Sequence, residues 1–239
     1  MSKNLIVSGH VLTGLYPYDK EYSRRNELYA DYKEYADFLG VDIEIKKDQF
    51  SNDRSDYLWE HGTWLKLDVI IAFATNNKYD KMLWIDSDVV INKELAYKVD
   101  PLELYANDSE RPEIAIVYDN FLPLHYHAFD EFSKKKYDFY EFMFGDEVKL
   151  YHKINSAMFV INKKAAKVIH ETLLSLPVSI ICGYESLYGH FPNDECIIEM
   201  AMPHLKHEFF DNITESNSGE VKAFTHYCGI DQKRTLFYE

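Results

Sequence analysis

The sequence predicts an α/β domain in which helices flank a mostly parallel β-sheet. Short apolar runs that are typical of buried strands alternate along the chain with longer segments of helical periodicity. Hydrophobic residues make up 46% of the 239 residues, which is enough for a large core. The chain holds only nine glycines and seven prolines, and it shows no internal repeat or low-complexity linker. We therefore expect residues 1–239 to form a single domain.

The first elements are predicted to be a strand, a helix and a second strand. Asn4 to Ser8 is a short apolar run that ends at Gly9, as a buried strand does. From Ser23 to Leu39 apolar side chains recur at helical spacing, the first residue suits an N-cap, and Gly40 suits the helix end. Val41 to Ile45 alternates apolar and acidic residues, which predicts a strand with one solvated face.

The rest of the chain continues this alternation. Thr63 to Asn77 carries its apolar residues on one helical face, and Lys81 to Ile85 and Ile114 to Tyr118 are apolar enough for fully buried strands. The later elements are predicted at Asn155 to Ile161 (strand), Lys163 to Leu174 (helix), Asp194 to Met202 (helix) and Val221 to His226 (strand).

One long segment, Asp119 to Lys153, shows neither the helical nor the strand period. It is crowded with tyrosine, phenylalanine, histidine and charged residues. Aromatic rings can stack on sugars, and loops of this kind often cover functional edges of a sheet. We expect this segment to be a mobile lid or an acceptor platform.

The charge and the cysteine content exclude several classes of protein. The 26 Lys and Arg residues against 40 Asp and Glu residues give a net charge of −14, which disfavours nucleic-acid and anionic membrane partners. Three cysteines without a CxxC spacing form neither a disulfide framework nor a zinc site. No apolar run approaches the ~20 residues of a membrane span, and no signal peptide is recognised. These features predict a cytoplasmic protein without a transmembrane segment.

Two aspartates, Asp86 and Asp88, flank the small residue Ser87 directly after the predicted buried strand Lys81 to Ile85. Ligands of open parallel sheets bind beyond the carboxyl ends of the strands. Two carboxylates at such an edge can hold one hard cation, Mn²⁺ or Mg²⁺, which in turn bridges the oxygens of a diphosphate. The alternative reading is a pair of aspartates that cap a strand-to-loop turn.

Several motifs in the chain resemble, in order, those of the metal-dependent glycosyltransferases of the GT-A fold. Together they span about residues 3 to 233. The resemblance is closest to the glycogenin-like and the galactosyl- and xylosyltransferase-like retaining enzymes. Besides the Asp86-Ser87-Asp88 triplet, the motifs are Arg25 to Ala30, Thr63 to Leu67, Asn155 to Ile161, Pro192 to Cys196 and Phe224 to Gly229.

The resemblance implies a Rossmann-like GT-A fold with a mixed central sheet and flanking helices. Residues 1–118 would bind the nucleotide sugar, and residues 119–239 would bind the acceptor and supply a C-terminal metal and diphosphate tail. The implied reaction moves a hexose or pentose from a nucleoside-diphosphate sugar, in particular a UDP-sugar, to a saccharide or glycan acceptor. It would depend on Mn²⁺ or Mg²⁺ and retain the anomeric configuration.

The same resemblance implies roles for individual residues. Glu195 would stabilise the sugar in the transition state or act as a transient nucleophile, and Asp194 would hold sugar or acceptor hydroxyls. The chain departs from the family pattern at Ala157, where the family has glycine, and it lacks the Lys-Pro-Trp ending. Asp119 is a further candidate for a sugar contact. The implied metal ligands are Asp86, Asp88 and His226, and the implied contacts of the nucleotide sugar are Lys66, Asp86, Ser87, Asn155 and Lys233.

Two other readings of the sequence remain open at this point. The run from Asp86 to Ile91 also fits the motif of haloacid-dehalogenase-type phosphatases, in which the first aspartate is phosphorylated. Those enzymes place that aspartate on the first strand, whereas here two strands and two helices precede it. The 19 tyrosines would also suit a non-enzymatic carbohydrate-binding module, which needs no metal and no diphosphate site.

Overall fold

The structure of the chain is a computed structural model. It describes residues 3–11, 18–48, 58–118, 142, 154–177, 194–210, 214–216 and 222–226. Of the predicted lid segment, Asp119 to Lys153, only residue 142 is described, so the lid stays a prediction. Among the described residues, no helix has the length and apolarity needed to cross a membrane.

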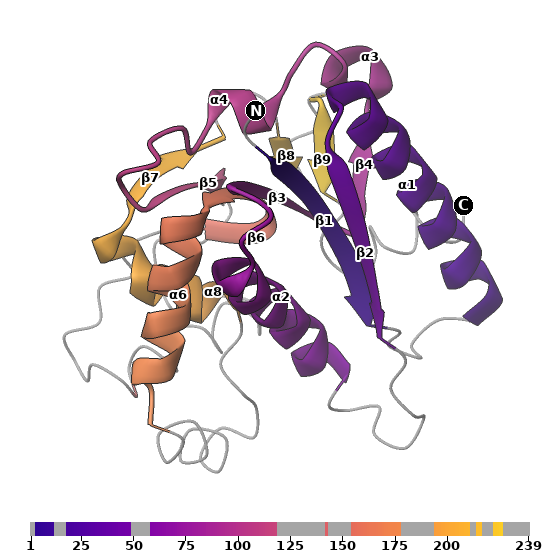
Figure 1. Cartoon of the computed structure of the whole chain (residues 1–239). Coiled ribbons are helices and arrows are strands. Elements are labelled where there is room, and N and C mark those ends of the chain that lie inside the picture. The colour runs from indigo at the N-terminus through magenta and orange to yellow at the C-terminus, as the bar shows by residue number, and fades with distance from the viewer. Residues whose placement is uncertain are drawn as a thin grey trace.

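Strands and helices alternate along the chain in the predicted order (Figure 1). The first two long helices begin five residues earlier than predicted, so Ser23 lies inside the first helix and the prediction of an N-cap there was wrong. The first half comprises β1 (Asn4–Val11), α1 (Tyr18–Leu39), β2 (Asp42–Asp48), α2 (Leu58–Thr75), β3 (Lys81–Asp86), β4 (Val89–Ile91), α3 (Lys93–Ala96), α4 (Pro101–Leu104) and β5 (Glu113–Tyr118). The second half comprises β6 (Ile154–Asn162), α6 (Lys163–Ser175), α8 (Asp194–Ala201), the 3₁₀ turn η4 (Met202–His204), β7 (Lys206–Phe209), β8 (Thr214–Ser216) and β9 (Phe224–His226).

The large sheet is mixed. Its six strands follow the order β2-β1-β3-β6-β5-β7. β1 pairs in parallel with β2 and β3, and β5 pairs in parallel with β7. β6 runs antiparallel to both of its neighbours, β3 and β5. The apolar pattern alone favoured a mostly parallel sheet, and it could not reveal the direction of β6, because a strand buried on both faces reads the same either way.

A small second sheet follows the order β4-β9-β8. β4 pairs antiparallel with β9, so that Val89 lies opposite His226 and Ile91 opposite Phe224. β8 pairs in parallel with β9. This sheet joins the segment directly after Asp88 to residues near the C-terminus, and it is therefore the feature that brings two distant parts of the chain to one site.

Two apolar cores lie on opposite faces of the large sheet. Figure 1 shows α1 on one side and α2, α6 and α8 on the other. β3 serves both cores, because Met82 and Trp84 pack with α2, α6 and α8, while Leu83 and Ile85 pack with α1. This double burial explains the uninterrupted apolar run of β3. It also leaves the first polar residue after the run, Asp86, at the carboxyl edge of a central strand.

Candidate metal and donor site

A tyrosine of α1 contacts the turn that carries the two aspartates. The hydroxyl of Tyr32 shares its single hydrogen between the carbonyl oxygen of Val89 at 2.5 Å and that of Asp86 at 2.8 Å. Tyr32 is fully buried in the core between α1 and the sheet. A rigid aromatic side chain thus pins both ends of the β3–β4 turn, which fixes where Asp86 and Asp88 project.

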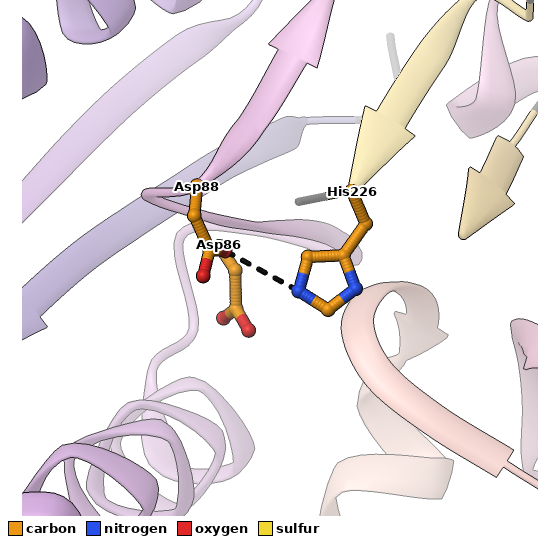
Figure 2. A group of neighbouring side chains, drawn as sticks. All are labelled: Asp86, Asp88 and His226. Carbon is orange, nitrogen blue, oxygen red and sulfur yellow. Dashed lines mark ion pairs between the residues drawn. The ribbon is translucent and has the colours of Figure 1, made fainter. Parts of the chain in front are cut away.

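Asp86, Asp88 and His226 come together at this turn (Figure 2). The pairing of Val89 with His226 across β4 and β9 places the imidazole beside Asp88. His226 Nε2 lies 3.4 Å from Asp88 Oδ1, and one ligand atom from each of the three residues lies within 4.8 Å of the others. The three residues implied as metal ligands therefore share one place, although the histidine lies far along the chain.

The chemistry of these side chains fits a divalent cation. Two carboxylates and one imidazole suit Mn²⁺, and the two carboxylates also suit Mg²⁺, which prefers oxygen ligands. His226 turns its Nε2 toward Asp88 Oδ1, 3.4 Å away, while its buried Nδ1 points away from the aspartates (Figure 2). A neutral imidazole therefore offers Nε2 as a ligand atom on the side where the carboxylates lie. Asp86, Asp88 and His226 are thus suited to hold such an ion.

Burial and the neighbouring charges shift the pKa of Asp86 in opposite directions. Burial raises the pKa of Asp86 above its ordinary value, and the carboxylate of Asp88 raises it further, while the ammonium of Lys66 acts in the opposite direction. Two neighbouring carboxylates disfavour each other's charge, and a bound cation favours the ionised form of both. Trp84 Nε1 also donates to Asp86 Oδ1 at 2.5 Å, which orients the carboxylate.

Lys66 reaches the site from α2. Its Nζ lies 3.2 Å from both carboxylate oxygens of Asp86 and 3.1 Å from Asp194 Oδ2. It also donates to the carbonyl oxygen of Ser156 at 2.9 Å. Burial by itself lowers the pKa of Lys66, but Asp194 and Asp86 outweigh burial and raise it, so the side chain is a cation. Lys66 is accordingly an internal counter-ion that joins β3 to α8.

The first turn of α8 faces the start of β6. Because β6 is antiparallel to β3, its first residues lie at the same edge as the last residue of β3. Ser156 Oγ donates to Asp194 Oδ2 at 2.5 Å, and the Ser156 backbone N–H donates to Glu195 Oε1 at 3.0 Å. Asp194 is 2% exposed and Glu195 6% exposed. Both carboxylates of the predicted catalytic pair are therefore held by β6.

On the other side of the turn, Arg25 of α1 lies buried against Ser87. Its Nη1 donates to Ser87 Oγ and, at 3.5 Å, to the Ser87 carbonyl oxygen. Burial raises the pKa of Tyr29, which hydrogen-bonds the same serine. Sequence reasoning missed Arg25 as part of the site. The sequence did contain an indication, because Arg25 lies on the same helical face as the apolar residues Leu28 and Tyr32. A cation on a buried face needs a partner, so its position pointed to a polar contact.

The remaining predicted site residues lie apart from these contacts or outside the described residues. Asn155 Oδ1 accepts the backbone N–H of Ala157 at 2.9 Å, a local bond at the start of β6. Lys233 and Asp119 lie outside the described residues. Ser156 and Trp84 belong to the site without having been predicted, and their residue types alone would not have identified them.

Comparisons with known proteins identify the fold. The sequence matches no family model and no curated protein. Among solved structures, the chain is similar to a glycosyltransferase involved in the glycosylation of the major capsid of PBCV-1, with 14% identity, a TM-score of 0.52, and coverage of 98% of this chain and 97% of that one. It is also similar to the galactosyltransferase LgtC in complex with donor and acceptor sugar analogs, with 11% identity, a TM-score of 0.51 and coverage of 94% and 87%.

A third likeness is to the bifunctional glycosyltransferase WbbM, with 12% identity and a TM-score of 0.50. It covers all of this chain and 50% of the WbbM chain. These likenesses, together with the mixed six-stranded sheet and its flanking helices, show that the chain has the GT-A fold that the sequence motifs implied.

Proposed function

We propose that the protein is a metal-dependent glycosyltransferase. It would move a hexose or pentose from a UDP-sugar to a saccharide or glycan acceptor with retention of configuration. The observation that carries the proposal is the meeting of Asp86, Asp88 and His226 at the carboxyl edge of a central strand in a GT-A fold. The similar structures named above, a capsid glycosyltransferase and a galactosyltransferase, support sugar transfer.

In this proposal Asp86, Asp88 and His226 hold Mn²⁺ or Mg²⁺. When bound, the ion supplies a Lewis acid that neutralises charge developing on the leaving diphosphate. The protein carries a net charge of −14 and would otherwise repel an anionic donor. A cation at this cluster therefore explains how so acidic a chain binds a nucleotide.

The other donor contacts are assigned by position. Ser87 lies between the two aspartates, and Asn155 is the second residue of β6, at the same edge of the sheet, so both remain our candidates for the nucleotide sugar. Lys233 remains the candidate for the diphosphate. Lys66 is buried between Asp86 and Asp194, and we assign it to hold Asp86 in place on the donor side of the site.

In retention by double displacement, a nucleophile on the face of the sugar opposite the diphosphate bonds to the anomeric carbon as the diphosphate leaves, and the acceptor oxygen then displaces it. In retention by front-side attack, a carboxylate on that face stabilises the oxocarbenium-like sugar. We assign that position to Glu195, whose Oε1 is fixed by the Ser156 backbone N–H. A fixed carboxylate stabilises the oxocarbenium-like sugar, or attacks it, while the acceptor hydroxyl is positioned. Because Asp194 already binds Lys66 and Ser156, we assign it to orient these groups in addition to any contact with sugar hydroxyls.

The metal assignment is tested by replacing Asp88. In isothermal titration calorimetry with Mn²⁺ present, Asp88→Ala is expected to abolish metal-dependent binding of UDP. Asp80→Ala is the matched control, since Asp80 is exposed just before the other end of β3. Both variants are expected to unfold cooperatively near the wild-type temperature. Unchanged UDP affinity in Asp88→Ala would overturn the metal assignment.

The stereochemical assignment is tested on the product. NMR of the freshly formed glycoside is expected to show the anomeric configuration of the donor. Glu195→Gln is expected to lower kcat at least ~10²-fold, about 2.7 kcal/mol, with little change in the donor KM, because the carboxylate acts in the transition state. An inverted anomeric coupling contradicts retention, and a fully active Glu195→Gln removes this residue from the mechanism.

The two alternative functions are less well supported by the structure. A haloacid-dehalogenase-type phosphatase places its nucleophilic aspartate at the end of the first strand, whereas Asp86 ends β3, after two strands and two helices. A carbohydrate-binding module gives no reason for acidic and imidazole side chains to converge on one point. The fold likeness to glycosyltransferases favours neither alternative.

A further inference from the structure

We infer that Ser156 is a positioning residue that holds the carboxylates at the start of α8 in place against the Asp86 end of β3. The inference rests on the proposed glycosyl transfer and adds a residue for which neither the motifs nor the fold provides a role. It follows from the contacts of one small side chain and its backbone with three elements, α2, β6 and α8.

Every polar atom of Ser156 is used. Its Oγ donates its hydrogen to Asp194 Oδ2 at 2.5 Å and accepts a hydrogen bond from Lys66 Nζ at 2.8 Å. Its carbonyl oxygen accepts from the same ammonium at 2.9 Å, and its N–H donates to Glu195 Oε1 at 3.0 Å. The residue is 4% exposed, so water does not compete for these bonds.

The hydrogen bonds of Ser156 orient the first turn of α8, which apolar packing alone does not. The inner side of α8 is anchored by Cys196, Ile197 and Ile198, all buried in the core that α2 and α6 share. Apolar contacts are not directional, so they fix how closely the helix packs on the core better than the direction in which its first-turn side chains point. Hydrogen bonds to charged groups are short and directional. The orientation of the Asp194 and Glu195 carboxylates therefore depends on their hydrogen bonds with Ser156.

The same residue connects α8 to the proposed metal ligands. Lys66 has three N–H donors, and it shares them between Ser156, Asp194 and Asp86. Through this lysine the position of the α8 carboxylates is tied to that of Asp86. Catalytic groups that move by a fraction of an ångström lose rate before they lose binding, because orientation matters most in the transition state.

The test compares two buried serines of the same sheet. Ser156→Ala removes the Oγ but leaves Lys66 paired with Asp194 and the N–H of residue 156 on Glu195. Ser8→Ala is the matched control, since Ser8 of β1 is 0% exposed and its Oγ has no hydrogen-bond partner among the described residues. Ser156→Cys, which keeps the volume and weakens the hydrogen bond, is the second variant.

The first measurement needs no substrate. Hydrogen–deuterium exchange is expected to speed up about tenfold for the amides of 194–201 in Ser156→Ala, and by a smaller factor in Ser156→Cys, while 81–86 stays protected. Ser8→Ala is expected to exchange like the wild type in both segments. Wild-type protection of 194–201 in both Ser156 variants would overturn the inference.

The second measurement is hydrolysis of UDP-glucose or UDP-galactose with Mn²⁺ present, in which water takes the sugar in place of the acceptor, followed as release of UDP. With the active sites counted by calorimetric titration of UDP, Ser156→Ala is expected to lower kcat per site about tenfold with the donor KM changed less than about twofold. Counting the sites separates a loss of rate from a loss of folded protein, which a role in stability alone would cause. A wild-type kcat in Ser156→Ala overturns the inference and leaves the proposed function standing. A wild-type protein that neither binds UDP nor turns over either donor defeats the proposed function, and exchange alone then decides the role of Ser156.

Discussion

At the scale of single residues, Lys66 balances the charge at the Asp86 end of the sheet. Its ammonium lies within 3.2 Å of Asp86 and 3.1 Å of Asp194 in a place from which water is largely excluded. Although burial lowers the pKa of Lys66, the two carboxylates raise it above the ordinary value. Removing one member of such a network leaves the other charges buried without compensation, which costs far more than the loss of a surface pair.

We expect Lys66→Met to lower the free energy of unfolding by about 3 kcal/mol, measured by urea denaturation. Lys164→Met is the matched control, because Lys164 pairs with the exposed Glu110 at 3.2 Å and such a pair contributes less than about 1 kcal/mol. Equal losses in the two variants would show that the buried network stabilises the fold no more than a surface ion pair does.

At the scale of elements, α1 must end at a defined point because it holds the β3–β4 turn through Tyr32 and leads directly into β2. The helix ends at Leu39, and Gly40 takes a φ of 68°. Its N–H donates to the carbonyl oxygen of Asp37, and the following N–H reaches back to Ala36 at 3.0 Å. This left-handed residue reverses the chain into the sheet, which is the role that the sequence predicted for Gly40.

Gly40→Ala is expected to reduce the free energy of unfolding by about 1 kcal/mol. A Cβ at this position meets no atom within 4 Å, so the cost comes from the backbone conformation alone. Gly9→Ala provides the contrast, because its Cβ would lie 2.6 Å from the Lys46 carbonyl oxygen and would force β1 and β2 to shift. Urea denaturation of both variants is expected to show a larger loss of stability in Gly9→Ala than in Gly40→Ala. A Gly40→Ala variant as stable as the wild type would contradict the prediction.

At the scale of the whole molecule, ligand binding and stability are coupled through the β4–β9 pair. This pair joins residues directly after Asp88 to residues near the C-terminus, and His226 and Asp88 face each other across it. A ligand that binds both residues binds only the folded chain. Its binding free energy therefore adds to the stability of the whole fold.

We expect Mn²⁺ together with UDP, at about 100 times the Kd, to stabilise the fold by about 2.7 kcal/mol. For a chain of this size that corresponds to a rise in Tm of about 5–10 °C in a thermal-shift measurement. EDTA is expected to abolish the rise, and Mn²⁺ alone to produce a smaller one. A response to Mn²⁺ and phosphate without nucleotide would instead favour the phosphatase, and a metal-independent response to sugar would favour the binding module.

Much of the fold was predictable because burial leaves a local pattern. The apolar run of β3 and the helical stripe of α1 each extend over enough residues to show their period, and the structure contains both. The short strands β4, β7 and β8 were not predicted. A strand of three or four residues is too short to show a period, and only its pairing partner defines it.

For the site, the Asp86-Ser87-Asp88 turn was predictable from the chain alone, since an apolar strand and the polar residues that end it are neighbours along the chain. Family motifs added His226, Asp194 and Glu195 as separate candidates. The antiparallel direction of β6, which brings Ser156 to Lys66, 90 residues away, became visible in the folded structure. Hydrogen bonds over such separations depend on how strands pair and helices pack, and the sequence around each residue does not reveal that arrangement.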